Sequence, residues 1–185
     1  DGTAGGFTRG PSATVSGTLA PNNTADLDGE GDNSGGVSVW NGANVNFDRC
    51  TFVGNSAGTG SALMVGKVAT ATVTHSNFWD NGNDPLAVNS FDTTGTTLSV
   101  SYSNMTGGAD SVTVSDADAI LNWGSGNIDV DPVFVDTADG NYHLLASSQL
   151  INGGHPDSLD SDGSRAYMGA YPYLNSYSGP TWYIT

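Results

Sequence analysis

Three residues at nearly constant spacing are the first candidates for chemistry. Arg49, His75 and Tyr102 are 26 and 27 residues apart, and a similar segment follows each of them. A guanidinium, an imidazole and a phenol on one face suit carbohydrate, because flat groups pack on sugar rings while their N–H and O–H groups bond hydroxyls. The alternative interpretation is three exposed corner positions that share no role, and spacing alone favours it. We carry the three residues forward as a candidate carbohydrate-binding strip.

Catalytic groups are otherwise scarce. Hydrolysis of glycosides requires two carboxylates that face each other across a cleft. Asp129 and Asp131 alternate on one side of a strand, but they precede Pro132, and turn and strand-edge bonding explains them better. The histidines make no metal-binding spacing, and the chain has neither a serine nucleophile elbow nor a phosphate-binding glycine loop. The sequence therefore predicts no catalytic residue and favours a protein that is not an enzyme.

One acidic segment could hold calcium. Carboxylates stand at positions 1, 3, 5 and 7 of this segment, as at the start of a calcium loop: Asp26, Asp28, Glu30 and Asp32. Gly31 supplies the turn at position 6, but Val37 stands at position 12 in place of the closing Glu. The alternative is an acidic turn in solvent. Calcium is the only cofactor that the sequence predicts, and residues 157–163 are a second, poorer candidate.

The elements that must position these groups are visible as a repeat. The segment Cys50–Asn55 returns as Ser76–Asn81 and again as Ser103–Gly108. Short stretches of alternating apolar and polar residues, broken by Gly, Asn, Asp and Ser, indicate short strands and turns. A repeat of this length is typical of a solenoid, in which each unit buries its apolar face against its neighbours. We therefore expect an all-β protein built as a stacked parallel β-helix.

The repeat also predicts which residues stack. Two columns of large apolar side chains are expected in the core: Phe52, Phe78 and Met105, and Phe47, Val73 and Val100. An amide ladder is expected at one corner: Asn23, Asn55 and Asn81. A rung of small buried residues is expected beside them, in which the single cysteine is structural: Cys50, Ser76 and Ser103. At about 4.8 Å per coil, four to six coils make a rod of roughly 20–30 Å.

The repeat pattern and the composition divide the chain into four parts. Residues 1–12 are predicted as an N-terminal arm, and residues 13–135 as β-helix coils with the acidic insertion at 26–33. Residues 136–171 are predicted as a C-terminal coil and cap that shields the last open coil, and residues 172–185 as an aromatic tail.

Charge restricts the partners. The 185 residues include 19 acidic and 4 basic ones, and the net charge is −15. Such a chain should repel nucleic acid and anionic membranes and attract cations. It has no apolar run of about 18 residues that would suggest a membrane span, and no signal peptide is apparent. We therefore expect neither nucleic-acid binding nor direct membrane insertion.

Two stretches carry a resemblance to a known class. GNIDVDPVFVDTADGNYHLL, followed by DGSRAYMGAY, resembles the C-terminal coils of secreted bacterial right-handed parallel β-helix proteins. NFDRCTFVGNSAGTGSALMV and THSNFWDNGND resemble the same class, which includes polymorphic outer-membrane proteins and pectate-lyase-like enzymes. The resemblance covers about residues 13–171. It implies a right-handed parallel β-helix of four to six coils with an irregular C-terminal cap, in a secreted or cell-surface protein of bacterial origin.

The resemblance leaves activity open, because this architecture serves lyases, hydrolases, adhesins and structural proteins. The clusters that it would imply for pectin hydrolysis are absent from the chain: Asn-Thr-Asp, Asp-Asp, Gly-His-Gly and Arg-x-Lys. We therefore expect a non-catalytic extracellular structural or adhesive module. A polysaccharide lyase or glycosidase-like protein and a calcium-dependent carbohydrate-binding module are the alternatives.

The two ends of the rod suggest association. The first ten residues are rich in glycine, whereas the last five have strong strand propensity. Trp182, Tyr183 and Ile184 are therefore candidates for self-association, in which the tail of one subunit covers the start of the next. Packing of the tail on its own rod is the alternative. The expected partners are the protein itself, other surface proteins or polysaccharides.

Overall fold

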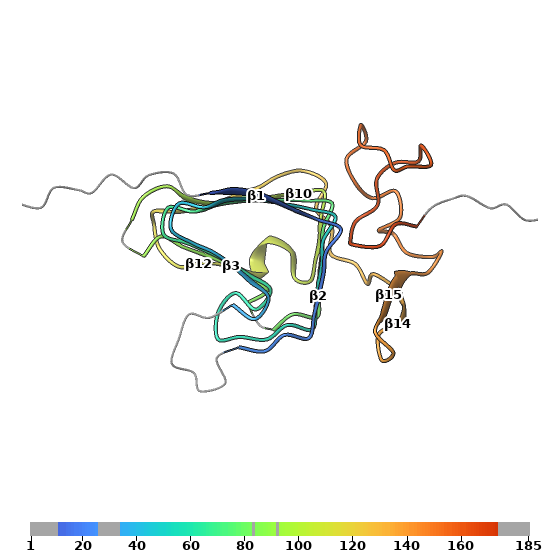
Figure 1. The fold of residues 1–185 in the computed structure, drawn as a ribbon, viewed down its shortest axis with the longest axis horizontal. Helices are drawn as coiled ribbons and strands as arrows, with labels where there is room; N and C mark the ends of the chain where they lie inside the picture. The colour runs from blue at the N-terminus through green and yellow to red at the C-terminus, as the bar shows by residue number, and fades with distance from the viewer. Residues whose placement is uncertain (1–10, 26–33, 83, 92, 174–185) are drawn as a thin grey trace, which may run out of the picture.

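A stack of parallel β-coils makes up most of the molecule, and a smaller lobe lies beside it (Figure 1). The computed structural model describes residues 11–25, 34–82, 84–91 and 93–173. No helix in these parts of the chain is long and apolar enough to cross a membrane.

Three parallel sheets form the walls of the stack, and each coil adds one strand to each wall. The first sheet contains five strands: β1 (Ser12–Ser16), β4 (Asn44–Asp48), β7 (Thr70–Thr74), β10 (Thr96–Ser101) and β13 (Ala119–Trp123). The second contains four: β2 (Leu19–Pro21), β5 (Thr51–Val53), β8 (Asn77–Trp79) and β11 (Asn104–Met105). The third contains four: β3 (Val37–Val39), β6 (Leu63–Gly66), β9 (Leu86–Asn89) and β12 (Val112–Val114).

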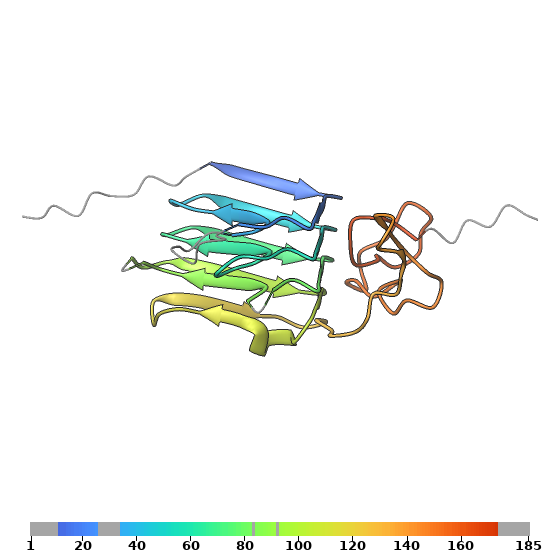
Figure 2. The same cartoon turned by 90° about the horizontal axis from the view of Figure 1, so that it is seen from below.

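These strands make four complete coils and begin a fifth. In Figure 1 the N-terminal coil is nearest the viewer, and the chain runs clockwise through the three sheets as it recedes. Figure 2 shows the same coils from the side as a ladder of rungs. The molecule is therefore the right-handed parallel β-helix that the sequence predicted. Within the described ranges, one 3₁₀ turn, η1 (Gly108–Ser111), lies between β11 and β12 in the last complete coil.

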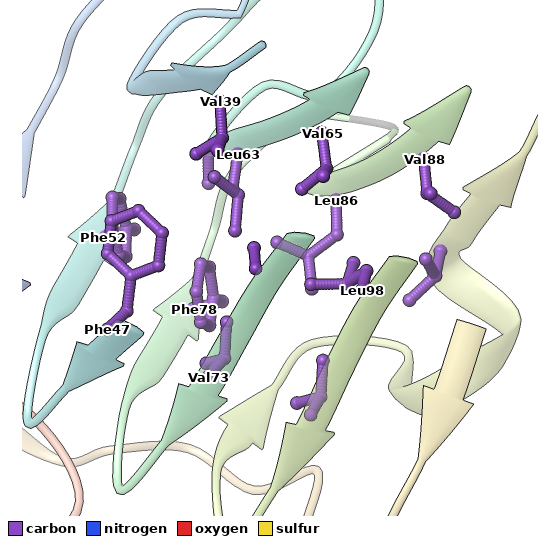
Figure 3. Close-up of a cluster of buried hydrophobic side chains, with 14 of the residues drawn as sticks. Val39, Phe47, Phe52, Leu63, Val65, Val73, Phe78, Leu86, Val88 and Leu98 are labelled. Atoms are coloured by element: carbon purple, nitrogen blue, oxygen red, sulfur yellow. The ribbon is translucent and has the colours of Figure 1, made fainter. Parts of the chain in front are cut away.

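The predicted core columns are confirmed. Phe52 pairs in register with Phe78, and Phe78 with Met105. The rings of Phe52 and Phe78 stack with centroids 4.7 Å apart. Phe47, Val73 and Val100 form the neighbouring column. Figure 3 shows Phe47 and Val73 among the side chains that fill the space between the sheets. Each large side chain buried in this way contributes about 1.5–3 kcal/mol.

The predicted amide ladder is also confirmed. The Nδ2 of Asn23 donates to the Oδ1 of Asn55 at 2.9 Å, and the Nδ2 of Asn55 donates to the Oδ1 of Asn81 at 2.9 Å. Asn77 and Asn104 form a second, buried pair in the same way, which the sequence analysis missed. The first ladder satisfies backbone and amide groups that would otherwise be buried without partners. In the second pair the Nδ2 of Asn104 donates to the Oδ1 of Asn77, and the buried Nδ2 of Asn77 has no hydrogen-bond partner among the described residues.

Cys50 occupies the small buried rung that was predicted for it. Its backbone N–H donates to the Oγ of Ser76, and the N–H of Ser76 donates to the Oγ of Ser103. The Cys50 side chain is buried, and burial raises the pKa of its thiol. Both observations indicate a packing role.

Each coil turns sharply at corners where the backbone enters the left-handed region, and two of these corners lie at the two ends of the second sheet. The first corner, between the first and second sheets, holds Arg49 (φ 53°), His75 (φ 48°) and Tyr102 (φ 46°). The second corner, after the second sheet, holds Asn22, Gly54, Asp80 and Gly107 at φ values between 51° and 80°. A positive φ disfavours most side chains, so stacking repeated along the column must compensate each corner.

The lateral lobe, residues 134–173, differs in place from the cap that the sequence predicted. Its only strands, β14 (Phe134–Asp136) and β15 (Asn141–Leu144), pair antiparallel. The N–H of Gly169 donates to the carbonyl of His75, and the N–H of Ala170 donates to the Oγ1 of Thr51. The lobe therefore lies along the second sheet, beside the coils (Figure 2), because its donors pair with corner and strand groups there.

Candidate functional site

The structure brings Arg49, His75 and Tyr102 together at the first corner, as the spacing predicted. The lateral lobe covers them. His75 is only 8% exposed, and the ring of Tyr102 packs edge-to-face on His155 with centroids 4.6 Å apart. The guanidinium of Arg49 lies 5.7 Å from the ring centroid of Tyr167. The column is therefore an internal contact surface in this structure, and its members are engaged by the protein itself.

Asp48 is the centre of a polar network at this corner. Its carboxylate accepts bonds from the Nη1 of Arg49 at 2.7 Å and the Oγ1 of Thr74 at 3.1 Å, and it lies 2.7 Å from the Nδ1 of His75. Burial opposes ionisation of Asp48, but the hydrogen bond with His75 and the charge of Arg49 outweigh burial and lower its pKa. Asp48 thus stays ionised and holds the corner side chains in place.

Asp160 belongs to the lobe and completes the network. Its Oδ1 lies 3.6 Å from the Nη2 of Arg49, and its side chain is only 3% exposed. Burial raises the pKa of Asp160, and the charge of Arg49 only partly opposes this. Arg49 is therefore shared between two carboxylates, one from the coils and one from the lobe. This cluster of one guanidinium and two carboxylates fixes the lobe on the rod, and it has no net positive charge left for an anionic ligand.

A cavity of about 300 Å³ opens beside this network, lined by Arg49, Asp160 and Tyr167 among others. Burial raises the pKa of the Tyr167 phenol, so it remains protonated at neutral pH. Hydrolysis needs one carboxylate as an acid and another as a base or nucleophile across a cleft. Asp48 and Asp160 instead lie on either side of one guanidinium, which suits attachment better than catalysis.

Asp129 and Asp131 have the bonding roles that the sequence favoured for them. The Oδ2 of Asp129 accepts from the N–H of Gly107 at 3.1 Å, and the Oδ1 of Asp131 accepts from the N–H of Val133 at 2.8 Å. Asp131 therefore closes a local turn, whereas Asp129 bonds the corner of the preceding coil.

The calcium and self-association predictions fall mostly outside the described residues. This is the case for Asp26, Asp28, Glu30 and Asp32, and for Trp182, Tyr183 and Ile184. The poorer calcium candidate, residues 157–163, is described, and Asp160 there lies against Arg49. Within the described ranges, no group of three or more His, Cys, Asp or Glu side chains could hold a metal ion.

The outward face of the first sheet is a feature that the sequence analysis missed. On β7 it presents Thr70, Thr72 and Thr74, and on β10 it presents Thr97, Ser99 and Ser101. Asp48 is the only charged outward residue on the five strands, although the chain has a net charge of −15. The face is therefore a nearly neutral array of hydroxyl and amide groups. The polar residue at every second position of each repeat was the signal that could have revealed it.

Comparison with known proteins gives no relative: no family model, no curated protein and no solved structure matches this chain. The resemblance to secreted bacterial β-helix proteins therefore stays a prediction.

Proposed function

We propose that this protein is a non-catalytic structural or adhesive module of a bacterial cell surface or fibre, and that it assembles head to tail. The observation that carries the proposal is the pairing of the end strands. Among the described residues, β1 pairs only with β4, and β13 pairs only with β10. Unpaired strand edges are templates for pairing with another chain.

The direction of the strands specifies how two copies would meet. All strands within each of the three walls are parallel, so a second copy placed end to end by translation and rotation about the rod continues each wall as a parallel sheet. A contact of this kind is heterologous and does not close, so it builds a fibre. Because the lateral lobe lies beside the coils, its described part leaves both ends of the stack accessible.

Side-chain chemistry supports the same proposal. The acidic groups with shifted pKa values hold the lobe or close turns, and the broadest regular face is an array of hydroxyls and amides. A flat neutral face of this kind suits adhesion to other polar surfaces. The aromatic tail at Trp182, Tyr183 and Ile184 remains the proposed connector between subunits. An enzyme acting on polysaccharides remains the alternative, but no described group favours it.

A proline on the open edge of β1 tests the assembly. The N–H of Asn44 donates to the carbonyl of Pro11, and the N–H of Gly17 donates to the carbonyl of Asp48. Successive residues of a strand point their N–H and C=O groups to opposite sides, so odd-numbered residues of β1 face β4. The N–H of Thr14 therefore points away from β4, towards the open edge. Thr14→Pro removes that donor without removing a bond to β4, and prolines on edge strands block pairing.

The matched control is Thr14→Val, which keeps the backbone donor. Sedimentation velocity over a range of concentrations should show large assemblies for the wild type and Thr14→Val. It should show mainly folded monomers for Thr14→Pro. Equal assembly of both variants would exclude the β1 edge as the contact.

A further inference from the structure

We propose that a cavity at the second corner binds a single neutral sugar ring. The cavity has a volume of about 240 Å³ and lies between the corner and the turn that joins β14 to β15. The residues that matter to the argument are Asn22, Gly54, Trp79, Asp80, Thr137 and Tyr142. Pockets for drug-sized ligands are about 300–1,000 Å³, so this smaller cavity suits one ring.

The cavity arises from a gap in the corner column. Asn22, Gly54 and Asp80 hold equivalent positions in successive coils, and all three have a positive φ. Gly54 contributes no side chain, and a Cβ at this position would lie 2.2 Å from the Oδ1 of Asn22. The glycine therefore leaves room for the Asn22 amide, and Asp80 lines the same space from the next coil.

The lobe closes the other side of the cavity with a fixed phenol. Tyr142 is 4% exposed, and its ring packs edge-to-face on Phe134. Its hydroxyl oxygen accepts a bond from the Nδ2 of Asn22 at 3.1 Å. The hydroxyl proton of Tyr142 is therefore the part of this group that can be donated to a ligand. With the hydroxyl of Thr137, the wall offers both donors and acceptors, as a ring with several hydroxyls requires.

Trp79 supplies the apolar surface. It is the last residue of β8, it is partly exposed, and it lines the cavity. A sugar ring has C–H groups on one face and hydroxyls around its edge, so it can pack on an indole while its hydroxyls bond polar groups. Cavities that recognise small ligands combine aromatic surface with a few placed polar groups in this way.

Charge selects a neutral ligand. Asp80 lines the cavity, and no described lysine or arginine does. A uronic acid would bring its carboxylate close to Asp80 without a cation to compensate, so we infer that neutral hexoses and their N-acetyl derivatives are preferred. This site would give the adhesive role a ligand class, but it does not depend on head-to-tail assembly.

Saturation-transfer NMR on the full chain tests the site with methyl glycosides of glucose, galactose, mannose, N-acetylglucosamine and glucuronic acid. At least one neutral glycoside should bind with a dissociation constant of about 1 mM, as expected for a small ligand. Trp79→Ala should weaken that binding about tenfold or more. The matched control is Trp40→Ala, which removes a partly buried tryptophan that packs on Phe91 away from the cavity.

Asp80→Asn adds a second readout, since asparagine tolerates the positive φ at this corner. This variant should reduce the preference for neutral glycosides over the glucuronide. Circular dichroism of each variant verifies that it is folded. The proposal is overturned if no neutral glycoside binds at a concentration about ten times the expected dissociation constant. It is also overturned if Trp79→Ala and Trp40→Ala weaken binding equally. A fibre that binds no sugar would overturn this inference alone.

Discussion

Phe78 stacks on Phe52 with ring planes 6° apart, and Met105 lies in register on its other side. Because Phe78 is fully buried, Phe78→Ala should leave a cavity and lower the free energy of unfolding by about 3–5 kcal/mol. Phe78→Asp should abolish folding, because it places an unpaired charge in a continuous apolar column. Urea denaturation followed by circular dichroism measures both effects. A loss below about 1 kcal/mol for Phe78→Ala would contradict the packing described.

The two carboxylates around Arg49 should respond differently to pH. The pKa of Asp48 is lowered, so its interactions stabilise the fold above its unfolded pKa of about 3.9, and this stabilisation is lost as the pH falls through the folded value. The pKa of Asp160 is raised, so its ionisation costs stability at neutral pH, and this cost disappears in acid.

Isosteric variants separate these two effects. Asp48→Asn should lower the free energy of unfolding by about 1–3 kcal/mol at pH 7, and by much less at an acidic pH below the lowered pKa of folded Asp48. Asp160→Asn should not lower it at pH 7, because it removes a charge whose burial is unfavourable. Urea unfolding of the wild type and both variants at the two pH values provides the comparison. An equal loss of unfolding free energy in the two variants at pH 7 would refute the stabilising role of Asp48 and the unfavourable burial of the Asp160 charge.

At the scale of the elements, the amide ladder should be as important as the apolar columns. The Oδ1 of Asn55 accepts from the N–H and the Nδ2 of Asn23, while its Nδ2 donates to Ala20 and Asn81. Asn55→Ala should lower the free energy of unfolding by about 1–3 kcal/mol for each buried group that loses its hydrogen-bond partner.

Asn122 offers the control for this prediction. It lies exposed on β13, and among the described side-chain hydrogen bonds its Nδ2 donates only to the Oγ of Ser99. Asn122→Ala should change the free energy of unfolding by about 0.5 kcal/mol or less. The thermal midpoints of the two variants give the comparison, and similar midpoints would mean that the ladder contributes little.

The coils could be predicted from the sequence because parallel, in-register strands place like residues on like residues. Phe52, Phe78 and Met105 revealed their column through a constant offset. The strand β13 lies within the predicted coils, but its register was not predicted, because Ser99 and its neighbour Asn122 are only 23 residues apart and the repeat shortens there. Leu121 and Trp123 still continue the columns of Leu98 and Val100.

The place of the lobe could not be predicted, because its contacts do not repeat. The pair of Arg49 with Asp160 joins residues far apart in the chain, and nothing in the spacing indicates it. The spacing did place Arg49, His75 and Tyr102 in one column, but it could not show that the lobe covers them. The cavity beside Trp79 was likewise hidden, because it depends on the missing side chain of Gly54 and on Tyr142 from the lobe.

For the whole molecule, we expect no cleavage of glycosidic bonds. Asp48 and Asp160 both lie against Arg49 instead of facing each other across a cleft. Incubation with pectin and alginate should therefore release neither unsaturated products nor reducing ends. Reproducible turnover that disappears in Arg49→Ala or His75→Ala would show that the protein is an enzyme.

The central claim is that the rod is a building unit that joins end to end. Electron microscopy of the purified full chain at increasing concentration tests it directly. We predict filaments one rod wide, whose strands lie across the filament with the spacing of about 4.8 Å found between paired strands. Isolated single rods at every concentration, with sedimentation that shows only monomer, would contradict the claim.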